Sequence, residues 1–136
     1  MNRQLLVFIA IAAGLLVPAY AATAPKYPAF ELKLEDATGE RFLFSAGDAS
    51  ITSPIFVDIA GRDPTVADKK YRMRVEKRWV AAHLPEGAEF AYYGSAECKV
   101  KPRKMEFPGC EIIAFVIPAT GEKIAYFFYV GHWPFE

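Results

Sequence analysis

The sequence predicts an α+β domain: a mostly antiparallel sheet of five or six strands, with one long helix packed on it and one disulfide bond. Segments that are apolar throughout, or apolar at every second residue, lie on both sides of a single helical segment. Turn residues separate them at hairpin-like spacings, which disfavours a parallel doubly wound sheet. The expected order along the chain is therefore β-β-β-α-β-β-β. Two cysteines in a short chain that begins like an export signal indicate the disulfide.

Residues 1–21 are expected to be a secretory signal peptide. Arg3 supplies a basic start, residues 5–17 are apolar but too short to span a bilayer, and residues 19–21 fit the small-x-small cleavage pattern. Residues 22–136 would then form a single exported domain, either periplasmic or secreted. The alternative is an uncleaved membrane anchor, which the short apolar stretch disfavours. After cleavage we expect no stable membrane insertion.

Three strands are expected before the helix. The first alternates apolar and charged residues, as a half-buried strand does, and the turn composition of residues 36–39 leads into the second. The third is apolar almost throughout, with Asp58 in its middle. We expect Asp58 to face solvent or to pair with an arginine, and we keep it as a candidate functional carboxylate. These strands are residues 30–34, 41–44 and 55–60.

Residues 64–84 predict the long helix. Pro64 fits the first turn, and Thr65 with Asp68 forms a partial capping box. The helix carries two apolar stripes, of which the first should pack on the sheet. The second is either covered by other parts of the chain, which we favour, or contacts a partner. The stripes are Ala67, Tyr71, Val75, Trp79 and Ala82, and then Val66, Met73, Val80 and Leu84.

Three further strands follow the helix. Residues 89–100 are β-prone, and Gly94 is expected to mark a bulge or a bend. Residues 111–130 predict a β-hairpin at the centre of the sheet, because two apolar runs flank a short turn. Pro118 ends the first of these strands, and Gly121 supplies the positive φ that such a connection needs.

Cys98 and Cys110 are expected to form the disulfide. The bridge would close a loop of 13 residues, which stabilises the fold by about 3 kcal/mol in the chain-entropy model. The spacing does not match the C-x-x-C of a redox pair. A zinc site that adds His83 and His132 matches no known ligand spacing, so we expect neither a metal nor a cofactor.

The loop between the two cysteines is the candidate binding surface. It combines basic and apolar residues, which is typical of a recognition loop held at its base, although the apolar members could instead fill the core. The C-terminal tail is aromatic, and we expect Trp133 and Phe135 to dock on the domain. The candidate partner-binding residues are Lys101, Arg103, Lys104, Met105 and Phe107.

The charge pattern bears on the class of partner. Lys and Arg together number 16, as do Asp and Glu, so no overall field favours nucleic acid. Residues 62–78 are nevertheless strongly basic. This region is either a solvated helix face or a surface for an anionic partner.

The sequence contains no established catalytic motif, so an enzyme is less expected than a binding protein. We expect a small envelope binding module, such as an inhibitor, an immunity-like protein or an adaptor, that recognises a protein or an anionic envelope component. Two alternatives remain. One is a small hydrolase that uses Asp58, His83 or His132, and the other is a carrier of a small apolar ligand. The sequence does not indicate the oligomeric state.

Overall fold

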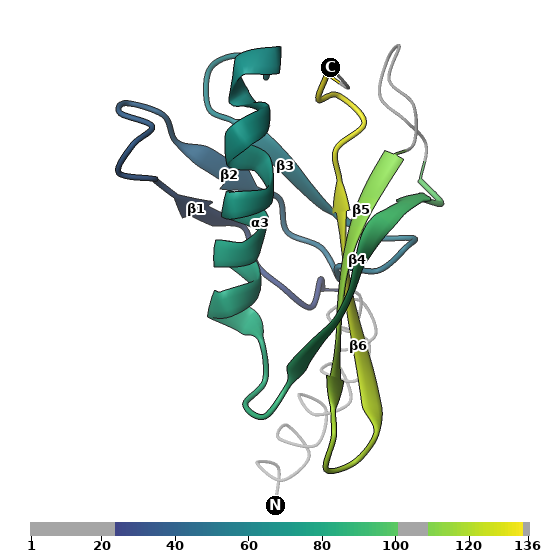
Figure 1. Ribbon diagram of the computed structural model, residues 1–136. Helices are drawn as coiled ribbons and strands as arrows, with labels where there is room; N and C mark the ends of the chain where they lie inside the picture. The colour runs from purple at the N-terminus through teal and green to yellow at the C-terminus, as the bar shows by residue number, and fades with distance from the viewer. Residues whose placement is uncertain (1–23, 101–108, 135–136) are drawn as a thin grey trace, which may run out of the picture.

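Six strands and one α-helix form in the computed structural model, which describes residues 24–100 and 109–134 (Figure 1). The predicted α+β class and the order of strands and helix along the chain are confirmed. The elements are β1 (Phe30–Leu32), β2 (Phe42–Phe44), β3 (Ile55–Ile59), the 3-10 turn η1 (Val66–Asp68), α3 (Lys69–His83), β4 (Glu89–Glu97), β5 (Gly109–Ile117) and β6 (Glu122–Tyr129).

The strands form a single sheet in the order β1-β2-β3-β6-β5-β4. Four of the neighbouring pairs are antiparallel, and β3 and β6 run parallel to each other. The hairpin that we expected at the centre is therefore off-centre: β6 lies beside β3 in the middle, whereas β5 is second from the edge. The parallel pair arises because the chain crosses through α3, β4 and β5 before β6 returns beside β3.

Local turn chemistry builds the β5–β6 hairpin as expected. Gly121 has a φ of 75°, and its N–H donates to the carbonyl of Ile117 at 2.7 Å. An L-residue with a Cβ rarely adopts that φ, so glycine is the favoured residue here. The register then pairs Ile117 with Glu122 and continues without a break to Cys110 and Tyr129.

The helix begins with one tight turn. The backbone N–H of Thr65 donates to the Asp68 carboxylate at 2.8 Å, which confirms the predicted partial capping box. Arg62 adds two hydrogen bonds to the same carboxylate, at 2.7 and 2.8 Å. These bonds outweigh the effect of burial and hold the pKa of Asp68 far below its usual value.

The buried face of α3 lies between the two predicted stripes. Val75, Trp79 and Val80 are buried, whereas Ala67 and Ala82 of the expected core stripe are exposed, so the prediction was wrong for those two residues. Ala67 belongs to the 3-10 turn, whose period differs from that of α3. The buried face runs from Val75 and Glu76 to Trp79 on the next turn, whereas Ala82, one turn further on, faces away from the sheet.

The core is formed mainly by aromatic residues of the sheet beneath Trp79. Trp79 contacts Tyr126 and Phe128 edge-on, with ring centroids 5.5 and 5.3 Å apart. Trp133 of the tail is also buried, and its indole N–H donates to the carbonyl of Val57 at 2.9 Å. The predicted docking of Trp133 is therefore confirmed, whereas Phe135 lies outside the described residues.

Strand β4 is irregular at its beginning. The predicted bulge at Gly94 was wrong, because the register shift lies between Phe90 and Tyr92. The shift places Phe90 beside Phe115, so Phe90 and Tyr93 both face the helix side of the sheet. The bulge therefore adds an aromatic ring to the side of the sheet that faces α3.

The predicted bridge between Cys98 and Cys110 is present, with Cα atoms 5.5 Å apart. Cys110 pairs with Ala96 on β4 and with Tyr129 on β6. Both half-cystines are buried in a small cluster with Tyr129. The disulfide thus anchors the end of β4 to β5 where both strands meet β6.

Candidate functional site

An apolar groove lies between α3 and the adjacent strands β4 and β5. Its volume is about 520 Å³, and the groove is open on one side. Met73 on the helix and Phe90 on the strand remain 39% and 62% exposed, so large apolar surfaces face solvent here. In Figure 1 the helix stands in front of β2 and β3, while β4 and β5 rise beside it. The apolar groove is lined by Met73, Lys77, Val80, Ala81, Leu84, Phe90, Tyr93, Ile113 and Phe115.

The second apolar stripe of the helix provides one wall of this groove. Val80 is buried and Leu84 half-buried, but the described residues leave 39% of Met73 exposed, and Val66 is exposed beyond the groove. The coverage by other parts of the chain that we favoured is therefore incomplete. The partner contact that we kept as the alternative fits the exposed part of the stripe.

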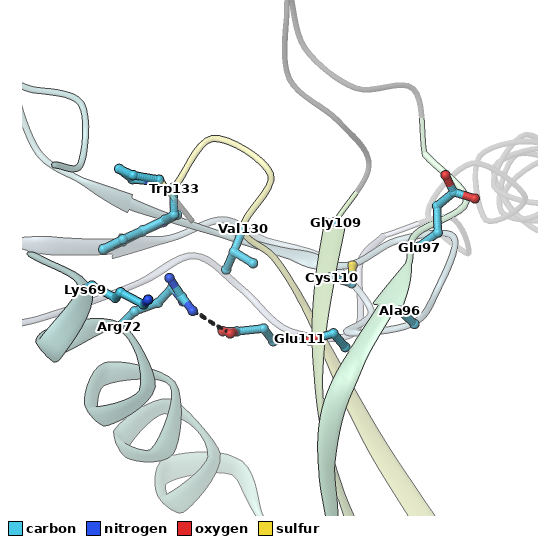
Figure 2. Close-up of a pocket in the computed structure, with 11 residues that line it drawn as sticks. Lys69, Arg72, Ala96, Glu97, Gly109, Cys110, Glu111, Val130 and Trp133 are labelled. Carbon is cyan, nitrogen blue, oxygen red and sulfur yellow. Dashed lines mark hydrogen bonds and ion pairs between the residues drawn. The ribbon is translucent and has the colours of Figure 1, made fainter. Parts of the chain in front are cut away.

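A polar pocket of about 410 Å³ adjoins the apolar groove (Figure 2). Residues of α3, β4 and β5 line both hollows. On α3, Arg72 lines the polar pocket and Met73 lines the groove. On β5, Glu111 lines the polar pocket and Ile113 lines the groove. The two hollows therefore lie next to each other along the helix. The polar pocket is lined by Lys69, Arg72, Ser95, Ala96, Glu97, Gly109, Cys110, Glu111, Val130, Trp133 and Pro134.

Arg72 and Glu111 form an ion pair at the boundary of the two hollows. The guanidinium donates to both carboxylate oxygens, at 3.0 and 2.7 Å. Figure 2 shows the two side chains pointing toward each other. The guanidinium also lies 5.8 Å from the centre of the Trp133 ring, within reach of a cation–π contact. Both partners are largely buried, so this two-bonded geometry fixes the helix against β5.

Glu76 lies one turn further along α3 and is fully buried. Its two carboxyl oxygens have no hydrogen-bond partner of good geometry among the described residues. Burial raises the pKa of Glu76 well above 4.5, and the facing Glu111 raises it further. We therefore take Glu76 as a neutral acid, because one arginine cannot compensate two buried carboxylates.

Glu111 shows the opposite pKa shift. Burial works against its ionisation, but contacts with Glu76 and Arg72 outweigh burial and hold its pKa below 4.5. Tyr93 of β4 completes the cluster, and burial together with the two carboxyls raises the pKa of its phenol. The cluster therefore pairs one cation with one anion, and the raised pKa values of Glu76 and Tyr93 favour the uncharged forms of that acid and that phenol.

The sequence analysis did not predict this cluster, although the sequence positions of Glu76 and Glu111 are informative. Glu111 lies at the start of an apolar strand, and Glu76 lies between the two apolar stripes of the helix. A charged residue in a buried segment indicates a partner. The sequence does not show that α3 and β5 bring these residues together, because 35 positions separate them.

The predicted binding loop cannot be placed. Its five candidate residues fall within residues 101–108, outside the described residues, so the proposed contacts stay a prediction. The loop ends at Gly109, which lines the polar pocket.

The three candidate catalytic residues divide into two places. Asp58 and His132 lie together, with Oδ1 of Asp58 2.8 Å from Nε2 of His132. We expected Asp58 to face solvent or to pair with an arginine; its side chain is 35% exposed, and it contacts a histidine of the tail. This contact satisfies the distance for an ion pair, but the ring nitrogens of His132 are buried without a hydrogen bond of good geometry among the described residues. Neither residue lines the apolar groove or the polar pocket.

His83 occupies a structural position at the end of α3. Its Nδ1 lies 2.7 Å from the carbonyl of Trp79, and its ring stacks on that of Trp79 with centroids 4.0 Å apart. The rings of Tyr27 and Phe30 contact it edge-on. Its described contacts do not include Asp58 or His132.

Residues 24–100 and 109–134 contain no cluster of three or more His, Cys, Asp and Glu side chains that could hold a metal ion. No helix in these ranges is both long and apolar enough to cross a membrane. No protein-family model, curated protein or solved structure matches this chain.

Proposed function

We propose that this protein is an exported binding module that holds an extended apolar segment of a partner protein in the apolar groove. One observation carries the proposal: an apolar groove lies open beside β4, with Met73 and Phe90 exposed at its rim. Large apolar side chains left in water mark interaction sites. Export rests on the sequence of residues 1–21.

The shape of the groove favours a polypeptide over a small apolar molecule. Sites for small molecules usually enclose most of the ligand surface, whereas this groove is open on one side. An extended segment needs a floor for alternate side chains and leaves its other side in solvent. Ile113 and Phe115 provide that floor, and α3 provides the wall.

The proposal is tested by selecting peptides on the purified protein from a displayed library of random short segments. Wild type is expected to enrich segments with apolar residues at every second position, and Phe90→Glu is expected to abolish this enrichment because it charges the rim. Val66→Glu is the matched control, since Val66 is equally exposed but lies outside the groove. Circular dichroism melting curves establish that both variants are folded.

Two outcomes would count against the proposal. The first is that wild type enriches no segment. The second is that Val66→Glu and Phe90→Glu reduce the enrichment equally. The test also includes a charge reversal of Arg103 and Lys104. If that change alone abolished the selection, the partner surface would be the loop predicted from the sequence.

A further inference from the structure

Strand β4 is an edge strand: it pairs with β5, and its outer side pairs with no other strand of the described residues. Natural edge strands are usually protected by lysine, proline, short length or a bulge. β4 has nine residues with neither lysine nor proline, and its bulge disturbs only the beginning. The regular part from Tyr93 to Glu97 therefore leaves backbone N–H and C=O groups facing outward.

The two ends of this edge carry like charges. Glu89 begins β4 and Glu97 ends it, and both side chains are exposed. Within the described residues neither forms an ion pair, and Figure 2 shows the Glu97 carboxylate pointing away from Arg72 and Glu111. Opposite charges on facing strands attract, so these two carboxylates favour a neighbouring strand with basic residues near its ends.

The same charges disfavour pairing with a second copy of this chain. Antiparallel pairing of two whole β4 strands would bring the Glu89 end of each copy beside the Glu97 end of the other. Like charges directly opposite each other on neighbouring strands are destabilising. A different polypeptide is therefore the better occupant.

We propose that the partner segment binds as a seventh strand along β4 and carries lysine or arginine opposite Glu89 and Glu97. This inference rests on the binding function proposed above and names the chemistry of its partner. Backbone hydrogen bonds to β4 supply affinity, and the alternate side chains that point toward α3 enter the apolar groove beside Tyr93 and Met73.

The probe is a synthetic peptide of eight residues, one for each register position that β4 occupies against β5, with lysine at both ends and threonine and valine alternating between them. Its two end lysines point to opposite faces of the sheet, as Glu89 and Glu97 do on either side of the bulge. We expect saturable binding, followed by isothermal titration, together with slower hydrogen exchange of outward-facing β4 amides. Two further peptides carry N-methyl groups on either the valine or the threonine amides. Only one edge of the peptide can pair, so one of these must lose binding at least about tenfold while the other retains it.

Charge exchange tests the second half of the inference. A peptide with glutamate at both ends is expected to bind about tenfold more weakly than the lysine peptide. The double variant Glu89→Lys with Glu97→Lys should reverse this preference. Both positions are exposed, so the variant is expected to fold, and its melting curve provides the check.

The outcomes separate the two proposals. If the lysine peptide binds but both N-methylated peptides bind as well as it does, the seventh strand is overturned while the groove remains a binding site. If the glutamate peptide binds as tightly as the lysine peptide, the proposed preference for basic residues opposite Glu89 and Glu97 is overturned. If neither these peptides nor any library segment binds, the binding function itself is wrong.

Discussion

The guanidinium of Arg72 on α3 donates hydrogen bonds to both carboxylate oxygens of Glu111 on β5, at 3.0 and 2.7 Å. This ion pair joins the helix to the sheet in the wall of the polar pocket, next to the apolar groove. The neutral acid Glu76 lies beside it in a fully buried position. The position of the helix wall relative to β4 therefore depends on a small buried polar cluster as well as on apolar packing.

Arg72→Met is expected to destabilise the fold by about 3 kcal/mol, because it leaves the Glu111 carboxylate buried without its cation. Urea unfolding followed by circular dichroism measures the free energy of unfolding. Arg41→Met is the matched control, since the Arg41–Glu31 pair has a similar bond length but is exposed. Equal losses in the two variants would contradict a special role for the buried pair.

The stability of Glu76→Gln relative to wild type is expected to increase as the pH rises. Below about pH 4.5 the acid is protonated in both the folded and the unfolded chain, so it adds no pH dependence. Above that pH the unfolded chain ionises Glu76, while the folded chain holds it neutral until its raised pKa is reached. The free energy of unfolding of wild type minus that of the variant should therefore fall as the pH rises above about 4.5. A difference that stays constant over this range would mean that Glu76 is not the neutral acid described here.

Trp133→Ala is expected to cost about 3 to 5 kcal/mol, since it removes a buried indole from the core. Trp133→Phe keeps an aromatic ring but leaves the carbonyl of Val57 without its donor, for a loss of about 1 to 2 kcal/mol. The melting temperatures of both variants separate the contribution of ring packing to stability from that of the hydrogen bond. Wild-type stability in Trp133→Ala would show that the tail does not dock.

Replacing both Cys98 and Cys110 by serine is expected to lower the free energy of unfolding by about 3 kcal/mol. The bridge restricts the unfolded chain, so reduction of the wild-type protein should give a loss of similar size. Urea midpoints of oxidised wild type, reduced wild type and the double variant provide the comparison. Coincident midpoints for all three would contradict a stabilising bridge.

Local signals made part of the fold predictable. The Gly121 turn, the Thr65–Asp68 cap, the disulfide and the buried Trp133 each depend on residue types whose roles are set within a few positions or by chemistry alone. The element order followed from hydrophobic periodicity.

The remaining features depend on contacts between distant segments. The parallel pairing of β3 with β6 and the meeting of Glu76 with Glu111 require knowledge of how the chain returns to the sheet. The bulge at Phe90 changes which side chains face α3, and no glycine or proline marks it. The groove likewise combines residues of α3, β4 and β5 that are far apart in the sequence, which explains why sequence reasoning selected the disulfide loop instead.

The most direct test of binding at the apolar groove is nuclear magnetic resonance of methyl-labelled methionine. The chain has three methionines, Met1, Met73 and Met105, of which Met73 lines the apolar groove and Met105 belongs to the loop predicted from the sequence. Met73→Leu and Met105→Leu assign the two signals. Titration with the lysine-flanked peptide is predicted to shift the Met73 methyl resonance in a saturable way and to leave that of Met105 in place. A shift of Met105 with no change at Met73 would contradict the account.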